Sequence, residues 1–239
     1  MSGLYALLCL AAVHLLANQK WLVGLIWHPR FLSFAAGVSF AYVFIDILPT
    51  LEIAEPILKE TFGFIPYLSH HAYLIALFGV LFFYGLHASK SRTPSERNFW
   101  LALFGYAVFN FFVGVSFADS SNPDIQPIPL YTTALAMHYF VNDRNLGQEE
   151  PGLYQNRARW GLICALFLGY CVGKFTHIPN SLEALVVSFL AGGVLLNVLR
   201  YELPKREKVG FPFFVLGTLL YTAIILQVGG AAAEPAMAS

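Results

Sequence analysis

Charged residues are scarce in this 239-residue sequence, and their scarcity excludes most soluble classes of protein. Only 12% of the residues are Asp, Glu, Lys or Arg, whereas a soluble domain carries about 25%. The formal net charge at pH 7 is zero, so the composition supports neither nucleic acid nor an acidic molecule as a partner. With 57% hydrophobic and 16% aromatic residues, the composition instead predicts a protein of the lipid bilayer.

Cysteine and the common catalytic motifs are scarce or absent as well. Cys9, Cys164 and Cys171 all lie in apolar segments, and an odd number of buried thiols argues against a disulfide framework. The sequence contains no Gly-x-Ser-x-Gly, no His-Glu-x-x-His and no phosphate-binding loop. We therefore expect no enzymatic activity and no resident cofactor.

Long apolar runs are what the sequence has in abundance. Eight apolar stretches are each near the length that crosses a hydrocarbon core about 30 Å thick. They cover residues 3–19, 31–51, 70–88, 98–118, 127–144, 158–174, 182–201 and 211–229. Polar or Pro-rich segments separate them, including Ser120 to Pro129 and Asn145 to Arg157. The sequence thus predicts a single all-α membrane domain over residues 1–229, followed by a disordered tail over residues 230–239.

One segment of the chain resembles another that lies 155 positions later. Residues 33–49 align without a gap with residues 188–204, and seven of the 17 aligned pairs are identical. Both copies begin with small residues and end in Leu-Pro close to an acidic residue. A match of this kind indicates an internal duplication, which many membrane transporters carry.

Basic residues are distributed unevenly between the ends of the apolar stretches. If the N-terminus lies outside, twelve of the 14 Lys and Arg residues fall on the inside, and only Lys59 and Lys174 fall on the outside. Because short cytoplasmic connections carry an excess of Lys and Arg, we expect a multi-pass protein of the plasma (inner) membrane with both termini outside. Stretch 31–51 then runs outward and stretch 182–201 runs inward, so the repeat is an inverted one.

The inverted repeat predicts eight transmembrane helices in the order three, two and three. The two repeats cover about residues 3–88 and 158–229, and the two central helices cover about residues 98–144. This arrangement, with Ala36-Gly37-Val38 leading to Leu48-Pro49 and Ala191-Gly192-Gly193 leading to Glu202-Leu203-Pro204, resembles the ZIP family of divalent-metal transporters. The resemblance implies alternating-access transport in a lipid bilayer. Since ZIP relatives commonly dimerise, it also implies a homodimer.

The metal motifs of the ZIP family are only partly present. The fourth helix of the family usually reads His-Asn-x-Pro-Glu-Gly, where this chain has Phe109 to Gly114 with Asn110 retained. The fifth helix usually reads His-Glu-x-x-His-Glu, where this chain has His138 to Asp143 with Asn142 in place of the second His. The resemblance therefore implies a transport site made by His138, Asn142, Asp143 and Asn110. It also places Asp46 and Glu202 along the pathway.

These residues predict weak metal binding. His138 and Asn142 are four residues apart and share a helix face, whereas Asp143 lies about 140° around the helix from His138. Zn²⁺ prefers four ligands from imidazole, thiolate and carboxylate groups, and this site offers one imidazole, one carboxylate and two amides. Metal transport is thus one hypothesis. A second is a ZIP-like scaffold that has lost metal transport and has another cargo or a non-transport role.

Each candidate residue also has a structural alternative. His138, Asn142 and Asp143 are equally typical of a satisfied cluster of interhelical hydrogen bonds, and Asp143 can simply mark the inner end of its helix beside Arg144. His14, alone near the middle of stretch 3–19, is expected to be structural.

A membrane b-type haem protein is a minor third alternative. His71 and His87 lie at opposite ends of stretch 70–88, about 24 Å apart at 1.5 Å per residue. His14 and His138 lie on other stretches. Pairs of histidines hold haem in membrane cytochromes, but no paired histidine pattern appears on a second helix of this chain.

Overall fold

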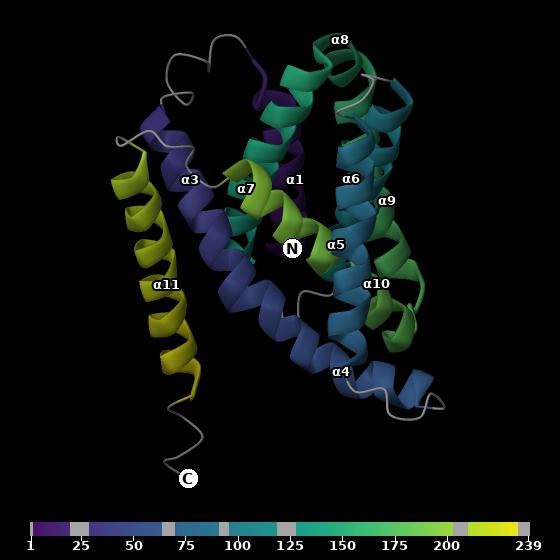
Figure 1. Ribbon diagram of the computed structural model, residues 1–239. Helices are drawn as coiled ribbons and strands as arrows, with labels where there is room; N and C mark the ends of the chain where they lie inside the picture. Colours follow the sequence, from purple (N-terminus) through teal and green to yellow (C-terminus); the bar gives the residue numbers. More distant parts are fainter. Residues whose placement is uncertain are drawn as a thin grey trace.

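The computed structural model describes residues 2–19, 29–63, 70–90, 96–118, 128–202 and 210–233, and every regular element in these ranges is a helix. Figure 1 shows these helices gathered into a bundle in which α3, η1 and α4 form one long diagonal rod. In chain order the elements are α1 (Ser2–Leu16), α3 (Pro29–Tyr42), η1 (Val43–Ile47), α4 (Leu48–Phe62), α5 (His71–Lys90), α6 (Glu96–Ala118), α7 (Ile128–Glu149), α8 (Pro151–Leu153), η3 (Tyr154–Ala158), α9 (Arg159–Phe175), α10 (Asn180–Asn197), η4 (Val198–Glu202) and α11 (Phe211–Ala233).

The helices have the length and the surface of a membrane protein. Four helical stretches of the described chain are long and apolar enough to cross a bilayer, namely Pro29–Phe62, Phe99–Ala118, Pro151–Phe175 and Asn180–Arg200. Large apolar side chains such as Phe78, Phe104 and Leu168 are exposed on the outer faces of the bundle, as expected where lipid rather than water is the neighbour. The prediction of an all-α membrane protein is confirmed at this level.

The cysteines depart from the sequence-based expectation. Cys9, Cys164 and Cys171 are free, as predicted, but all three are exposed rather than buried. Their helices are apolar on every side, so an apolar segment does not by itself show which residues face protein.

The second apolar stretch is longer than predicted. A helix end was expected at residue 51, but α4 continues through Pro49 and Pro56 to Phe62. Five residues of π-helix, η1, precede Pro49, and the Leu48 N–H donates to the Val43 carbonyl five residues back. Because proline has no N–H to donate and its ring crowds the preceding turn, this wider turn lets the helix pass Pro49 without a break.

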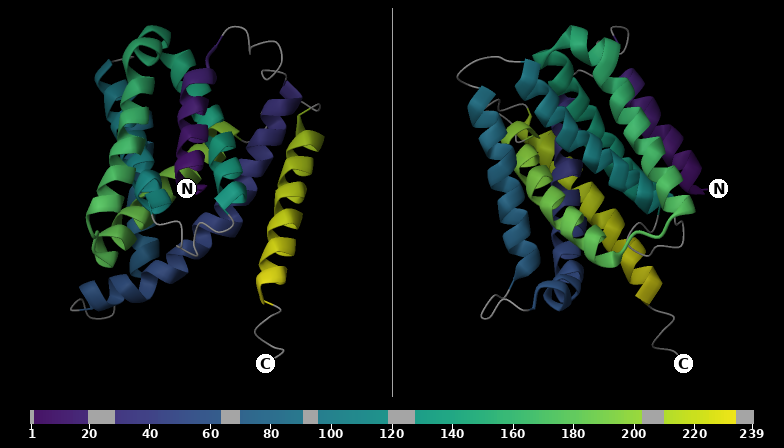
Figure 2. Two further views of the ribbon diagram at one scale, coloured as in Figure 1. Left: turned by 180° about the vertical axis from the view of Figure 1, so that it is seen from behind. Right: turned by 90° about the vertical axis from the view of Figure 1, so that its right-hand side faces the viewer.

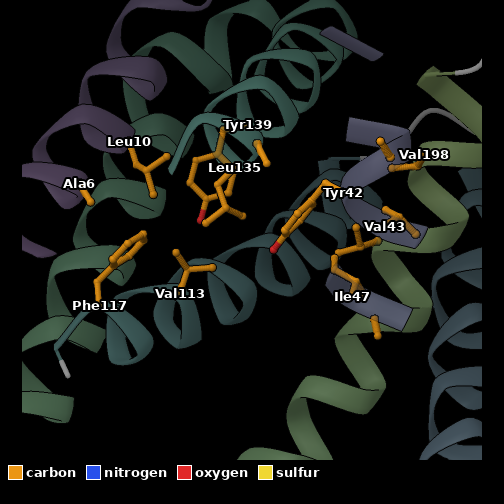
Figure 3. Close-up of a cluster of buried hydrophobic side chains, with 14 of the residues drawn as sticks. Ala6, Leu10, Tyr42, Val43, Ile47, Val113, Phe117, Leu135, Tyr139 and Val198 are labelled. Atoms are coloured by element: carbon orange, nitrogen blue, oxygen red, sulfur yellow. The ribbon is translucent and has the colours of Figure 1, made fainter. Parts of the chain in front are cut away.

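The same π-helical turn recurs in the second copy of the repeated segment. η4 covers Val198–Glu202, and η1 covers Val43–Ile47, which is the equivalent segment 155 positions earlier. The first residues of the two turns, Val43 and Val198, are fully buried in one hydrophobic cluster (Figure 3). The sequence match in the repeat therefore has a counterpart in local backbone geometry.

The polar segment between residues 145 and 157 was predicted as a break and is largely helical. α7 continues to Glu149, and a new helix begins at Pro151. The reason is that Leu146 and Tyr154 are buried in a cluster with Phe99 of α6 and Leu162 of α9. Their burial anchors both helices in a segment whose remaining residues are polar.

Among the described helices, three pairs cross with their backbones in contact at glycines of both helices. One is α6 with α9, through Gly114 and Gly169, and the other two involve the repeated segment. α3 packs along α11 (Figure 1), and α10 packs along α5. At the α3–α11 crossing, a Cβ atom added to Gly37 would overlap the Phe214 carbonyl, and one added to Gly217 would overlap the Phe34 carbonyl. Such close approach is open only to small residues.

The α10–α5 crossing repeats the α3–α11 crossing. A Cβ atom added to Gly192 would overlap the Ala76 carbonyl, and one added to Gly79 would overlap the Phe189 carbonyl. Gly37 and Gly192 are equivalent in the repeat, as are Phe34 and Phe189. Gly37 and Gly192 thus lie at close crossings, in equivalent positions of the two copies of the repeat.

The other helices of the bundle also pack in pairs. α6 packs along α9, and α1 packs along α7 (Figure 2). The interior that these four pairs enclose holds the buried polar side chains.

Substituting leucine for Gly37 or Gly192 is expected to lower the thermal unfolding temperature, because overpacking a helix contact costs about 1–3 kcal/mol or more. Gly161 in α9 is the matched control, since no atom lies within 4 Å of a Cβ placed there. Unfolding of purified Gly37→Leu, Gly192→Leu and Gly161→Leu in detergent checks this. Equal unfolding temperatures for all three variants would contradict a role of Gly37 and Gly192 in helix packing.

Candidate functional site

The four predicted transport-site residues are buried together in the interior of the bundle. His138, Asn142 and Asp143 lie on α7, and Asn110 lies on the neighbouring α6. His138 and Asp143 are each 1% exposed, and the two asparagines are nearly as buried. Asp143 therefore does not mark a helix end at the membrane surface, because α7 continues six residues beyond it to Glu149.

Asp143 and Asn110 are joined by a residue that sequence reasoning treated as structural. The His14 Nδ1 atom lies 2.6 Å from Asp143 Oδ2, and His14 Nε2 lies 2.8 Å from Asn110 Oδ1. The Asn110 amide nitrogen donates to the Tyr106 carbonyl, so its oxygen is the atom turned to His14. Both imidazole nitrogens thus face acceptors, an arrangement that the doubly protonated imidazolium satisfies in full.

The surroundings of His14 hold its ring in place. Tyr139 of α7 stacks on the imidazole with ring centroids 4.7 Å apart. The Tyr154 hydroxyl of η3 donates to the His14 carbonyl at 3.1 Å. A histidine in the middle of an apolar helix was the signal in the sequence. The hydrogen-bond partners of His14 could not be identified from the sequence, because they lie 96 and 129 positions away.

His138 belongs to a second set of hydrogen bonds. The Asn142 amide nitrogen lies 2.9 Å from His138 Nε2, and Ser39 Oγ lies 3.2 Å from His138 Nδ1. The Asn142 oxygen accepts from the Asn197 amide, and the Asn197 oxygen accepts from the Tyr106 hydroxyl. In this arrangement the Asn142 amide is the donor to His138 Nε2, and the Ser39 hydroxyl faces the other ring nitrogen.

Tyr106 joins the two sets into one polar network. Its carbonyl accepts from Asn110, and its hydroxyl donates to Asn197. The network runs from α1 through α6 and α7 to α10, and Ser39 adds α3. Sequence reasoning missed Ser39, Tyr106 and Asn197, although buried polar residues in apolar helices were the available signal.

The network occupies the atoms that a metal would need. The Asn142 amide covers the Nε2 lone pair of His138, and His14 covers the Asp143 carboxylate. Among the described residues, no group of three or more His, Cys, Asp and Glu side chains is placed to hold a metal ion. Binding Zn²⁺ at His138 would therefore require a rearrangement of these hydrogen bonds.

The predicted pathway residues lie elsewhere. Asp46 is in η1, where its carboxylate accepts from the Tyr221 hydroxyl of α11 at 3.1 Å. Asp46 lines a cavity of about 520 Å³ that is separate from the His138 network. Phe109 and Leu190 line this cavity, and they also line a cavity of about 20 Å³ beside His138 and Asn197. Glu202 ends η4, and its side chain lies outside the described residues.

Of the two histidines of stretch 70–88 that the haem alternative invokes, one has a structural partner and the side chain of the other lies outside the description. Glu55 of α4 accepts from His71 Nδ1 and from the backbone N–H groups of His71 and Ala72. This contact satisfies two free donors at the beginning of α5, as a capping carboxylate does. The side chain of His87 lies outside the described residues. Haem ligation by His14 or His138 would require breaking a hydrogen bond of the network.

Comparison with protein-family models, with curated proteins and with solved structures found no match for this chain.

The pairing of His14 with Asp143 predicts non-additive effects on stability. Removing one member of a buried ionic pair leaves the other unpaired and costs about 3–5 kcal/mol, whereas replacing both with apolar residues costs less. We expect His14→Leu and Asp143→Leu each to unfold at a lower temperature than the double variant. Thermal unfolding of the three purified variants tests this, and strictly additive losses would contradict the pairing.

Proposed function

We propose that this protein is a cation transporter of ZIP-like architecture that works by alternating access. In this proposal residues 1–229 form one membrane domain of eight spans arranged as three, two and three. The repeats cover about residues 3–88 and 158–229, and α6 and α7 are the central helices. The protein is a multi-pass protein of the plasma (inner) membrane, with both termini outside and the lipid bilayer as its surroundings. We propose no catalytic role, and a homodimer is the assembly that the resemblance implies.

The observation that carries the proposal is the repetition of one helix crossing. α3 meets α11 through Gly37 and Gly217, and α10 meets α5 through Gly192 and Gly79. Gly37 and Gly192 are 155 positions apart, and Gly79 and Gly217 are 138 positions apart. Each crossing therefore pairs the second helix of one half with the third helix of the other half, as expected of interlocked repeats.

Contacts at the two ends of α10 support an inverted relation between the halves. α10 packs against α4, which follows α3, and η4 at the end of α10 packs against α3 itself. The second helix of one half thus runs opposite to the second helix of the other. Inverted repeats of this kind allow one half to rock against the other around a site between them.

Divalent metal ions are the cargo that the resemblance to ZIP transporters implies. In that case His138, with Asn142, Asp143 and Asn110, is the transport site, and Asp46 and Glu202 lie along the pathway. A ZIP-like scaffold with a different cargo is the second candidate. It is favoured by the hydrogen bonds that already occupy His138 Nε2 and the Asp143 carboxylate.

Reporter fusions provide the test of topology. Fusions near Lys90, Arg157 and Lys205 are expected in the cytoplasm, and a fusion after Gly229 is expected outside, because basic residues concentrate in cytoplasmic connections. A cytoplasmic signal from the fusion after Gly229 would contradict the inverted arrangement.

Uptake of Zn²⁺ into proteoliposomes tests the metal hypothesis. We expect slow uptake that falls at least about tenfold in His138→Ala, because the only imidazole of the site is then lost, and less in Asn110→Ala. Thermal unfolding of each variant controls for misfolding. Equal uptake by the parent and His138→Ala would exclude the site, and no uptake by the parent would favour the second candidate.

A further inference from the structure

A cavity with polar and apolar lining residues in the described bundle has room for more than a bare ion. It measures about 520 Å³ and lies between η1, α4, α6, α7 and α10. Small-molecule sites usually measure about 300–1,000 Å³, whereas a water molecule takes about 30 Å³. Asn180 and Glu183, which line it, belong to the first turn of α10, so the cavity lies at the end of the bundle where α10 begins.

The Thr50 and Ser116 hydroxyls on its wall already donate their protons to backbone carbonyls. The Thr50 hydroxyl donates to the Ile47 carbonyl at 2.6 Å, and the Ser116 hydroxyl donates to the Phe112 carbonyl at 3.0 Å. Each hydroxyl has a single proton, so only oxygen lone pairs are left for a ligand. A ligand that fits these two oxygens must supply the N–H or O–H groups itself.

The charged residues on the wall also favour a ligand that donates hydrogen bonds. The carboxylates of Asp46 and Glu183 both line the cavity, and none of its described lining residues is Lys, Arg or His. Asp46 accepts one hydrogen bond from Tyr221, while a carboxylate has about four acceptor sites. The wall therefore favours a positively charged ligand.

The remaining wall is aromatic and aliphatic. The rings of Tyr42 and Tyr131 lie edge to face with centroids 5.9 Å apart, and both tyrosines line the cavity together with Phe109 and Phe112. Aromatic faces attract organic cations, and apolar walls accept their hydrocarbon parts. A metal ion gains little from the aromatic and aliphatic part of the wall, because it binds through lone pairs of oxygen, nitrogen or sulfur.

We propose that this cavity binds an organic ammonium ion that carries N–H groups, such as an alkyl amine or diamine. Its N–H groups donate to acceptors among Asp46, Glu183, Thr50 and Ser116, and its carbon chain lies against the tyrosine and phenylalanine rings. This names the cargo of the second candidate function and so rests on the proposed transporter, although binding itself does not require transport. Phe109 and Leu190 separate the bound ligand from the His138 network.

Isothermal titration of the purified full-length protein with putrescine tests the site. We expect binding by the parent and at least about tenfold weaker binding in Asp46→Asn and in Glu183→Gln, as for the loss of a hydrogen bond to a charged group. Glu52→Gln is the matched control, because Glu52 is exposed on α4 and does not line the cavity. Tetramethylammonium, which is cationic but has no N–H group, is expected to bind at least about tenfold more weakly than putrescine.

Several results would overturn the proposal. They are no heat from putrescine with the folded parent, equal binding by the parent and both cavity variants, or equal binding of putrescine and tetramethylammonium. Thermal unfolding of each variant shows whether it is folded. If Asp46→Asn does not fold, the binding of putrescine to Glu183→Gln is the test of the site. Uptake of labelled putrescine by proteoliposomes separates the two proposals. Binding without uptake would contradict the transporter and leave the site, whereas Zn²⁺ uptake without putrescine binding would contradict the site and leave the transporter.

Discussion

The architecture depends on how closely pairs of helices approach at their glycines. In a bilayer, apolar side chains gain nothing by leaving lipid for protein, so helices associate through close van der Waals contact and interhelical hydrogen bonds. Gly37 and Gly217 let α3 and α11 touch backbone to backbone, and Gly192 and Gly79 do the same for α10 and α5. These contacts set where α3 and α10 stand, and those two helices bring Ser39 and Asn197 to the polar residues of α7.

Inside this frame, the two buried histidines of the network have different partners. Both nitrogens of His14 lie beside oxygen atoms, one of Asp143 and one of Asn110. His138 lies beside the Asn142 amide and the Ser39 hydroxyl. Since burying an unpaired charge is costly, the contact with His14 stabilises the buried Asp143 side chain. Asp46 lies apart from this network, on the wall of the separate cavity.

Much of the fold could be predicted from the sequence, but less of the site. Apolar runs located the helices, and the repeat located two segments that share a π-helical turn and a close glycine crossing. The predicted helix boundaries were wrong in two places. In the polar segment 145–157, the buried residues Leu146 and Tyr154 keep the chain helical. At Pro49, a π-helical turn lets the helix continue. His138, Asn142, Asp143 and Asn110 do lie together, yet their partners on other helices, above all His14, could not be deduced from spacing along one helix. The metal role and the eight-span topology remain predictions.

The π-helical turns also determine how the two halves can deform. A π turn holds one residue more than an α turn, and one residue corresponds to about 100° of helix rotation. If the extra residue of η1 moved along the chain, Asp46 would swing about the axis of the α3–α4 rod while both ends of the rod kept their neighbours. η4 offers α10 the same freedom at the equivalent position. η1 and η4 are thus matched positions in the two copies of the repeat, at which a shift of this kind would turn a side chain while the flanking helix turns stay in place.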